Sequence, residues 1–281
     1  MEKKLQIEEI LKRIKFLKPI SGATAKVIQA LDNPESSAED IKDAILLDPA
    51  LTADVLRIVN SAYFALRQRV ANVKHAVALL GRKTIKKIIF TARAGTLLKR
   101  NLEGYPTQEN ANTLWEHSLV TAVSAEIIAE KLQYKDKELA YIGGLLHDIG
   151  KIILDQYVKD VTQKVEAELA KGKELTQIEK ELFGYDHAEL GGIMAENWQL
   201  PLPIKEAIAY HHSPTEASKE VMIAFIAYMA NNLANFICPL GNYHTQSTDP
   251  AVLQHIGLND ADMEEITLKI IAKKEEILTI A

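Results

Sequence analysis

The sequence predicts an all-α protein, built as a multi-helix bundle. Apolar residues recur at intervals of three and four, for example at Ile41, Ile45, Leu51, Val55 and Val59, and this spacing places them on one face of a helix. No segment alternates apolar and polar residues as a half-buried strand would, and the chain contains no internal repeat or low-complexity run. These observations favour helices along nearly the whole chain.

Turn residues divide the first hundred residues into helices. Residues 33–37 contain the proline, asparagine and serines of a turn followed by a helix cap. Asp48 and Pro49 predict the end of one helix and the start of the next, because proline fits the first helical turn and the aspartate can cap it. We expect a short helix that Gly81 closes, and another over residues 82–100.

The remaining chain begins with a polar link at residues 101–106. Gly150 predicts an interruption or cap, and the two prolines of residues 200–203 predict a break. The expected helical segments are residues 113–132, 138–157, 159–182, 186–198, 204–212, 221–237 and 259–281.

The charge changes sign along the chain. Residues 1–100 contain 19 Lys and Arg against 10 Asp and Glu, whereas residues 101–281 contain 14 against 28. No carboxylate occurs between Asp54 and Glu103, and no arginine follows Arg100. Such an abrupt change predicts two helical lobes, residues 1–100 and 101–281, with the first packed on the second.

The carboxylate-free basic stretch has two interpretations. It could bind nucleotide phosphates, nucleic acid or an acidic partner through long-range attraction. Alternatively, it is a solvated face that complements the acidic half of the same chain, which is the interpretation we favour. Only Tyr63, Phe64 and Phe90 could stack on bases there, so the sequence argues against nucleic-acid binding.

Composition excludes several classes of protein. A net charge of -5, with 47% hydrophobic and 25% charged residues, is ordinary for a globular chain and excludes a disordered, collagenous or disulfide-rich one. Cys238 is the only cysteine, which favours a reducing compartment. The N-terminus is charged throughout, unlike a signal peptide, and no apolar run approaches about 18 residues. We therefore expect a cytoplasmic protein without a membrane span.

Histidines gather in the second half of the chain in the order H…HD…H…HH, which comprises His117, His147-Asp148, His187 and His211-His212. A single helical histidine is usually a partly buried residue with one hydrogen bond, and we assign that role to His75, His244 and His255. Imidazole suits transition metals, and a carboxylate that bridges two ions suits a two-metal site. Such a site needs ligands that converge from several helices of a bundle.

Two segments resemble a known family. GLLHDIGKIIL resembles the signature of the HD superfamily of metal-dependent phosphohydrolases. The segment LDNPESSAEDIKDAILLDPALTADVLRIVNSAYFALRQRVANVKHAVALLG resembles the amino-terminal part of the HDOD family, the HD-related output domains of bacterial signalling proteins. The resemblance runs from about Leu17 to His212 and implies a helical N-terminal lobe followed by an HD-type lobe with a C-terminal helical tail.

The resemblance also implies a metal site. Its ligands would be His117, His147, Asp148, His187, His211 and His212, holding one or two ions of iron, manganese or zinc. Asp148 would bridge the ions, and Lys151 would stabilise charge or protonate a leaving oxygen, which makes both of them the candidate catalytic residues.

The sequence departs from the HD pattern at the position of its closing aspartate. Residues 221–248 contain no Asp or Glu, and Asn231, Asn232 or Tyr228 falls near that position. The GYP motif of the cyclic di-GMP hydrolysing branch is also missing after the paired histidines. We therefore expect metal binding to be retained and efficient phosphodiester hydrolysis to be impaired.

The functional expectation is a bacterial signal-transduction protein that works through contacts with a signalling partner. The alternative is a metal-dependent phosphohydrolase that acts on a phosphomonoester or phosphodiester, such as a nucleotide. A phosphate-bearing ligand is compatible with both.

Overall fold

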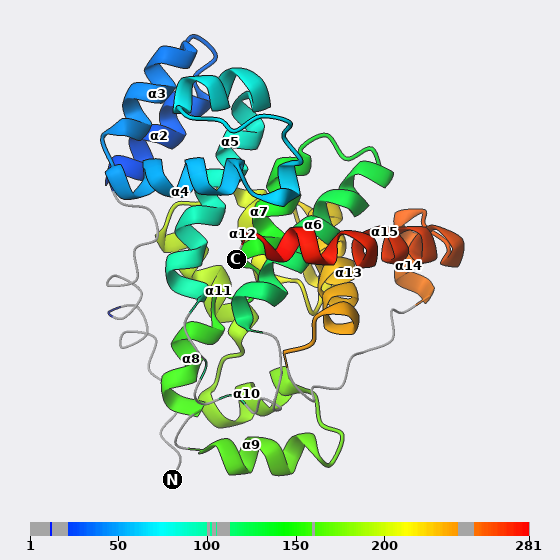
Figure 1. Cartoon of the computed structure of the whole chain (residues 1–281). Coiled ribbons are helices and arrows are strands. Elements are labelled where there is room, and N and C mark those ends of the chain that lie inside the picture. The colour runs from blue at the N-terminus through cyan, green and yellow to red at the C-terminus, as the bar shows by residue number, and fades with distance from the viewer. Residues whose placement is uncertain are drawn as a thin grey trace. The chain divides into compact units, whose positions relative to one another are not determined.

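The computed structural model describes residues 12, 22–99, 102, 105, 113–158, 161–240 and 250–280. These residues form helices and loops with no β-strand among them, which confirms the all-α prediction (Figure 1). His244 and most of the expected link at residues 101–106 lie outside the described residues.

The chain divides into two compact units. Of the described residues, 22–97 and 273–280 form the smaller unit, and the others form the larger unit. The last helix, α15 (Asp260–Leu278), is therefore shared between them.

The helices of the smaller unit are α2 (Gly22–Asp32), α3 (Ala38–Leu46), α4 (Pro49–Val59), the 3-10 turn η1 (Ala62–Phe64) and α5 (Val73–Leu98). Ser37 and Asp40 form a capping box at the start of α3. The Asp48 side chain accepts a hydrogen bond of 2.9 Å from the backbone N–H of Leu51 and thereby caps α4. Gly81, at a φ of 76°, interrupts α5 where the sequence predicts one helix to end and another to begin.

The larger unit contains α6 (Leu114–Lys131), α7 (Lys137–Leu146), α8 (Lys151–Val158), α9 (Thr162–Leu169), α10 (Leu175–Phe183), α11 (His187–Asn197), α12 (Leu202–Ala209), η3 (Pro214–Glu216), α13 (Val221–Ile237), α14 (Pro250–Ile256) and most of α15. Helix α6 packs against α7 and α13, and α12 packs against α7, α11 and α13 (Figure 1).

Helix α6 is buried along almost its whole length, from Leu114 to Ala129. At Gly144 a Cβ atom would lie 2.9 Å from the Thr121 carbonyl oxygen, so glycine lets α7 approach the backbone of α6. Helix α7 therefore packs closely on α6, and it also contacts α12 and α13. None of the described helices is long and apolar enough to cross a membrane.

Candidate metal centre

The structure brings the six expected metal ligands together inside the larger unit. His117 lies in the first turn of α6, and His187 is the first residue of α11. His211 and His212 follow directly after α12. All except His212 are buried; the His212 side chain reaches solvent.

The sequence-based expectation that the His147-Asp148 pair lies on a helix is wrong. Helix α7 ends at Leu146 and α8 begins at Lys151, so the pair occupies the turn between them. Gly150 explains this turn, because a Cβ atom there would lie 1.9 Å from the His187 carbonyl oxygen. The absence of a side chain allows the turn to approach the start of α11.

Asp148 is the centre of the cluster. Its Oδ2 atom lies 3.3 Å from Nε2 of His147 and 3.9 Å from Nε2 of His117. Its Oδ1 atom lies 3.2 Å from Nε2 of His187 and 3.6 Å from Nε2 of His211. The ligand atoms thus form two groups that share Asp148, one with His117 and His147 and the other with His187, His211 and His212.

Four imidazoles have their orientation fixed by an oxygen on the far side of the ring. The Nδ1 atom of each histidine lies within hydrogen-bond distance of an acceptor, as follows: His117 with Cys238 O at 3.0 Å, His147 with Gly144 O at 2.8 Å, His211 with Ile208 O at 2.7 Å and His187 with Glu179 Oε2 at 2.6 Å. These oxygens only accept, so Nδ1 carries the proton in each ring. In a neutral imidazole this leaves the Nε2 lone pair on the side of the ring that lies toward Asp148, within 3.9 Å of one of its oxygens.

The residues present fit a metal ion. The Nε2 atoms of His147 and His211 are buried and have no hydrogen-bond partner among the described residues. An unpaired buried acceptor is costly, and two of them aimed at one carboxylate are explained by a cation between them. Histidine with a carboxylate is a donor set for iron, manganese or zinc, and Nδ1–H bonds to oxygen are typical of metal-ligating histidines.

Burial sets the protonation of the cluster. Desolvation, with the neighbouring His147 next in importance, lowers the pKa of His117 to about 3. Desolvation also lowers the pKa of His211 to about 4. Both rings are therefore neutral at pH 7 and able to donate a lone pair to a metal.

His187 and Asp148 titrate in a different way. Burial lowers the pKa of His187, but the Glu179 carboxylate and the hydrogen bond to Asp148 outweigh burial and raise that pKa to about 9. Burial opposes ionisation of Asp148, yet His147 and Lys151 hold its pKa well below the ordinary range. Asp148 is consequently an anion in the metal-free protein.

Lys151 is the first residue of α8 and is buried, with its Nζ atom 2.5 Å from Asp148 Oδ2. It therefore lies beside the carboxylate that both groups of ligands share. The sequence selected this lysine as a candidate catalytic residue, and the geometry brings its ammonium group to the cluster.

Asn231 is the residue that faces His117 from α13. Its Oδ1 atom lies 3.2 Å from His117 Nε2 and accepts a hydrogen bond of 3.3 Å from Asn235 Nδ2. Of the three residues considered for the position of the closing aspartate, Asn231 is thus the one with a contact to a candidate ligand. A neutral amide oxygen occupies this corner of the cluster.

Glu179 is a residue of the site that the sequence did not single out. It is buried on α10, accepts a hydrogen bond of 2.9 Å from the His187 backbone N–H, and also accepts one of 2.8 Å from the Tyr105 hydroxyl. The sequence feature that could have identified Glu179 is its position within the apolar face of α10, among Leu175, Ile178 and Leu182. A glutamate at such a position needs a buried partner.

A surface cavity of about 400 Å³ adjoins the exposed histidine. His212 lines it together with Lys180, Lys205, Tyr210 and side chains of α11. His212 Nε2 also lies 3.0 Å from His187 Nε2, so one ring connects this cavity with the buried cluster.

Comparisons with known proteins relate the chain to others of similar sequence and fold. A curated relative from Treponema pallidum (strain Nichols), itself uncharacterised, is 26% identical over 234 residues, which cover 81% of this chain and 44% of that protein. The chain thus spans less than half the length of that relative.

Solved structures share the fold. An HDOD domain protein of unknown function from Geobacter sulfurreducens is 25% identical, with a TM-score of 0.73 over 97% of this chain and 99% of that one. A Marinobacter aquaeolei VT8 protein assigned by name to signal transduction is 23% identical, with a TM-score of 0.78 over 98% and 60% of the two chains. A Shewanella amazonensis SB2B protein named as a phosphohydrolase is 23% identical, with a TM-score of 0.72 over 97% and 98%.

The family assignment rests on sequence as well as on structure. The family model of the HDOD domain matches residues 17–214, which is more than half of the chain and includes all six candidate ligands. The chain therefore belongs to the HDOD family.

Proposed function

We propose that this protein is a regulatory HDOD signalling protein that retains a divalent metal in its HD site but hydrolyses phosphoesters inefficiently. The metal would be iron, manganese or zinc, with one or two ions held between the histidines. A signalling protein is the proposed partner, which accords with the signal-transduction role named for the similar Marinobacter protein.

The observation that carries the proposal is the pairing of His117 with Asn231. A carboxylate at this corner would add a negative charge and strengthen the binding of a second cation. Asn231 Oδ1 is a neutral donor 3.2 Å from His117 Nε2, so the group around His117 and His147 is the weaker of the two. A site in which one ligand group binds metal strongly and the other binds it weakly retains an ion in the first group. It loses the two-ion arrangement that phosphodiester hydrolysis uses.

The residues of the chain have separable roles in this site. Asp148 would contact both groups of ligands through its two oxygens, and Glu179 would orient His187 by accepting its Nδ1 proton. A bound divalent ion would supply Lewis-acid polarisation of a phosphoryl oxygen. Lys151 would hold a negatively charged oxygen beside Asp148 or donate a proton to it.

The alternative function, a metal-dependent phosphohydrolase, is favoured by one specific observation. Lys151 is buried at 2.5 Å from the shared carboxylate, which is a position suited to a group that stabilises developing charge. Phosphoester binding at the cavity beside His212 would bring substrate to the cluster. Under this alternative, Lys151→Met abolishes turnover while metal content stays unchanged.

The test is metal content followed by turnover. Protein purified anaerobically without an affinity tag is analysed by elemental mass spectrometry, beside His147→Ala and the matched control His75→Ala, which removes an exposed histidine of α5. We expect about one to two equivalents of metal in the wild type and in His75→Ala, and loss of metal in His147→Ala. Folded wild-type protein without metal would overturn the proposal.

Turnover separates the two functions. The metal-loaded protein is assayed with bis(p-nitrophenyl) phosphate and with p-nitrophenyl phosphate. The regulatory proposal predicts, on both substrates, at most a small excess of activity over the Asp148→Ala variant. Efficient metal-dependent turnover that is lost in Asp148→Ala would favour the phosphohydrolase.

A further inference from the structure

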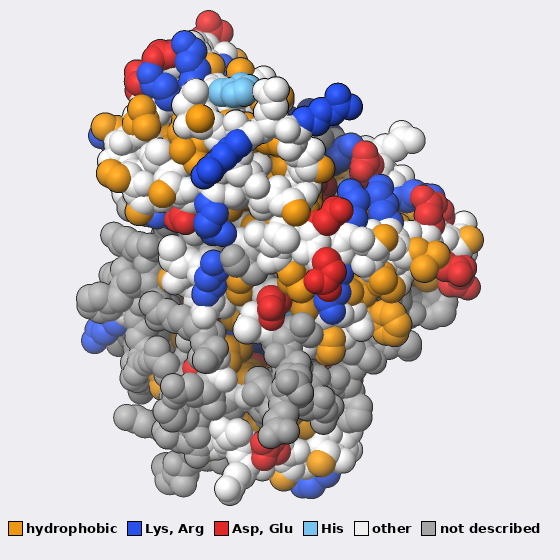
Figure 2. All heavy atoms as spheres, viewed as in Figure 1, with side chains coloured by type: hydrophobic (Ala, Val, Ile, Leu, Met, Phe, Trp, Pro, Cys, Tyr) orange, Lys and Arg blue, Asp and Glu red, His pale blue; other side chains and the backbone are white. Residues whose placement is uncertain are grey.

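Several Lys and Arg side chains of the basic stretch form ion pairs or hydrogen bonds within the smaller unit. Ion pairs join Lys74 to Glu39, Lys86 to Asp32 and Arg93 to Asp48. Arg82 donates hydrogen bonds to backbone carbonyls of the turn between α2 and α3, including Asn33 O at 2.6 Å. On the face shown in Figure 2, blue and red side chains accordingly lie next to one another around α3.

Two arginines of the same stretch differ from these. Arg67 and Arg69 are exposed in the loop that joins η1 to α5, and neither has an ion pair or hydrogen bond with the part of the chain that the structure describes. An unpaired guanidinium keeps its five N–H donors and its full charge available to an external anion.

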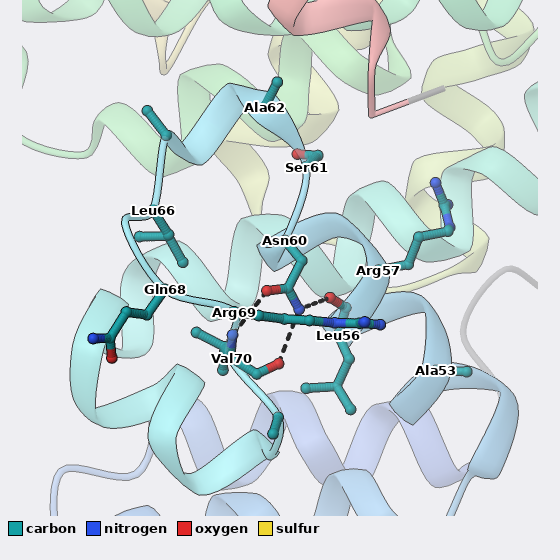
Figure 3. Close-up of a pocket in the computed structure, with 12 residues that line it drawn as sticks. Ala53, Leu56, Arg57, Asn60, Ser61, Ala62, Leu66, Gln68, Arg69 and Val70 are labelled. Carbon is teal, nitrogen blue, oxygen red and sulfur yellow. Dashed lines mark hydrogen bonds between the residues drawn. The ribbon is translucent and has the colours of Figure 1, made fainter.

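Arg69 lines a large cavity, whereas Arg67 does not. The cavity, of about 920 Å³, lies between α4 and the loop, and Figure 3 shows Arg69 extending from the loop toward α4. Its volume is in the range of small-molecule sites. The described residues that line it include two arginines, Arg57 and Arg69, and no Asp or Glu.

Asn60 holds the loop in place beside α4. Its Nδ2 group donates hydrogen bonds to Leu56 O at 2.7 Å and to Val70 O at 2.9 Å, and its Oδ1 accepts one from Val70 N at 2.8 Å (Figure 3). One side chain thus satisfies three backbone groups and ties the two walls of the cavity together. A cavity whose walls are fixed before binding loses less conformational entropy when a ligand enters.

The walls offer three polar groups to an anion. The Arg57 guanidinium is oriented by a hydrogen bond of 3.1 Å to Ile280 O, and Asp54 lies 3.8 Å from its Nε atom, so its charge is partly balanced. Arg69 carries the unbalanced charge. The Ser61 hydroxyl oxygen is buried and has no hydrogen-bond partner among the described residues. Donors of this kind suit a phosphate group.

We propose that this cavity binds a small phosphate-bearing molecule with a compact apolar part. Arg69 and Arg57 hold the phosphate, Ser61 donates a hydrogen bond to it, and Leu56 and Leu66 contact the apolar part. The site lies wholly within the smaller unit, and its ligand is independent of any metal in the larger unit. The smaller unit is then the part of this signalling protein that senses a metabolite.

The test uses phenyl phosphate as the probe and the full chain in the presence of a chelator, so that the metal centre does not contribute. Binding is measured by equilibrium dialysis at physiological salt for the wild type, Arg69→Gln and Arg67→Gln. The two variants remove the same charge from the same loop, but only Arg69 lines the cavity. We expect saturable binding of one equivalent, weakened about tenfold in Arg69→Gln and unchanged in Arg67→Gln.

A second variant tests the cavity itself. Ala53 is exposed on α4 and lines the cavity, so Ala53→Gln fills space without disturbing the core, and we expect it to abolish binding. Equal weakening in Arg67→Gln and Arg69→Gln would overturn the proposal in favour of diffuse attraction. So would inorganic phosphate bound as tightly as phenyl phosphate, or binding only of a macromolecular polyanion such as heparin.

Discussion

His117 and Asn231 face each other with acceptor atoms only 3.2 Å apart. The carbonyl oxygen of Cys238 fixes the proton of His117 on Nδ1, and Asn235 donates to Asn231 Oδ1, so neither Nε2 nor Oδ1 brings a proton to the contact. Two lone pairs directed at the same space repel each other unless a cation lies between them. This contact therefore indicates both that the site is built for metal and that its closing donor is neutral.

Restoring a carboxylate at this position should strengthen the metal site. Asn231→Asp adds one anionic ligand beside His117, and we expect metal affinity to rise about tenfold or more, which is about 1.4 kcal/mol, because a carboxylate attracts a divalent cation more strongly than a neutral amide does. Competition with a fluorescent chelator measures the change. Phosphodiester turnover in this variant alone would show that Asn231 is what limits catalysis.

Asn232→Asp is the matched control, since it introduces the same charge at the adjacent position, about 100° around α13. It should leave metal affinity close to that of the wild type. Equal affinities in all three proteins would contradict the role assigned to Asn231.

Gly150 sets the distance between the His147-Asp148 turn and α11. A Cβ atom at Gly150 would lie 1.9 Å from His187 O and 2.8 Å from Gly191 N, both of them backbone atoms that cannot rotate away. We expect Gly150→Ala to displace His187 from Asp148, to lower the free energy of unfolding by about 1–3 kcal/mol and to lose metal. Thermal unfolding and metal analysis give the two readouts.

Gly22→Ala is the comparison for Gly150→Ala. Apart from its chain neighbours and the backbone of its own helix, no atom of the described residues lies within 4 Å of a Cβ atom built at Gly22, so this change should leave stability within about 0.5 kcal/mol of the wild type. If Gly150→Ala melted at the same temperature as Gly22→Ala and kept its metal, the close approach would have no consequence for the site.

The sequence predicted most of the helices, and which histidines lie together, because both have local signals; it did not predict α14 or the division of residues 159–182 into α9 and α10. Asp48-Pro49 and Gly81 mark helix boundaries wherever they occur, and the order of the histidines limits which ones can converge. The turn at His147-Asp148 was not predicted, because the requirement for Gly150 comes from the carbonyl oxygen of His187, 37 positions later in the sequence.

Glu179 and Asn231 were not assigned for a similar reason. Their contacts with His187 and His117 are made across the bundle, and nothing adjacent to them in sequence specifies the partner. Spacing along one helix identifies a buried face, but the residue that this face meets is decided by packing.

The free energy of unfolding of the metal-free protein should be highest at an intermediate pH and should fall on both the acidic and the alkaline side. The pKa values of His117 and His211 fall to about 3 and about 4 on folding, so the unfolded chain binds more protons between about pH 4 and 6.5 and stability falls as the solution is acidified. The pKa of His187 rises to about 9, so its stabilising contribution is complete below about pH 6.5 and is lost as pH rises through 9.

Denaturant unfolding in the presence of a chelator, measured across this pH range, tests the expectation. Glu179→Gln removes the carboxylate that raises the pKa of His187. In this variant the free energy of unfolding should depend less on pH above neutrality, whereas its decrease at acidic pH should remain. If Glu179→Gln lost stability with rising pH as steeply as the wild type, a group other than His187 would have to titrate in that range.

Asn60 should control the loop that forms the smaller unit's cavity. Asn60→Asp keeps the size of the side chain but replaces both Nδ2 donors with an acceptor that faces the Leu56 and Val70 carbonyl oxygens. We expect the free energy of unfolding to fall by about 2 kcal/mol, since Val70 O loses its donor, Leu56 O keeps only the backbone N–H of position 60, and both oxygens meet a negative charge. Gln68→Glu adds the same charge at an exposed position of the same loop and should change stability by less than about 0.5 kcal/mol. Denaturant titration of both variants distinguishes the lost hydrogen bonds from the added charge, and equal stabilities would mean that Asn60 does not hold the loop.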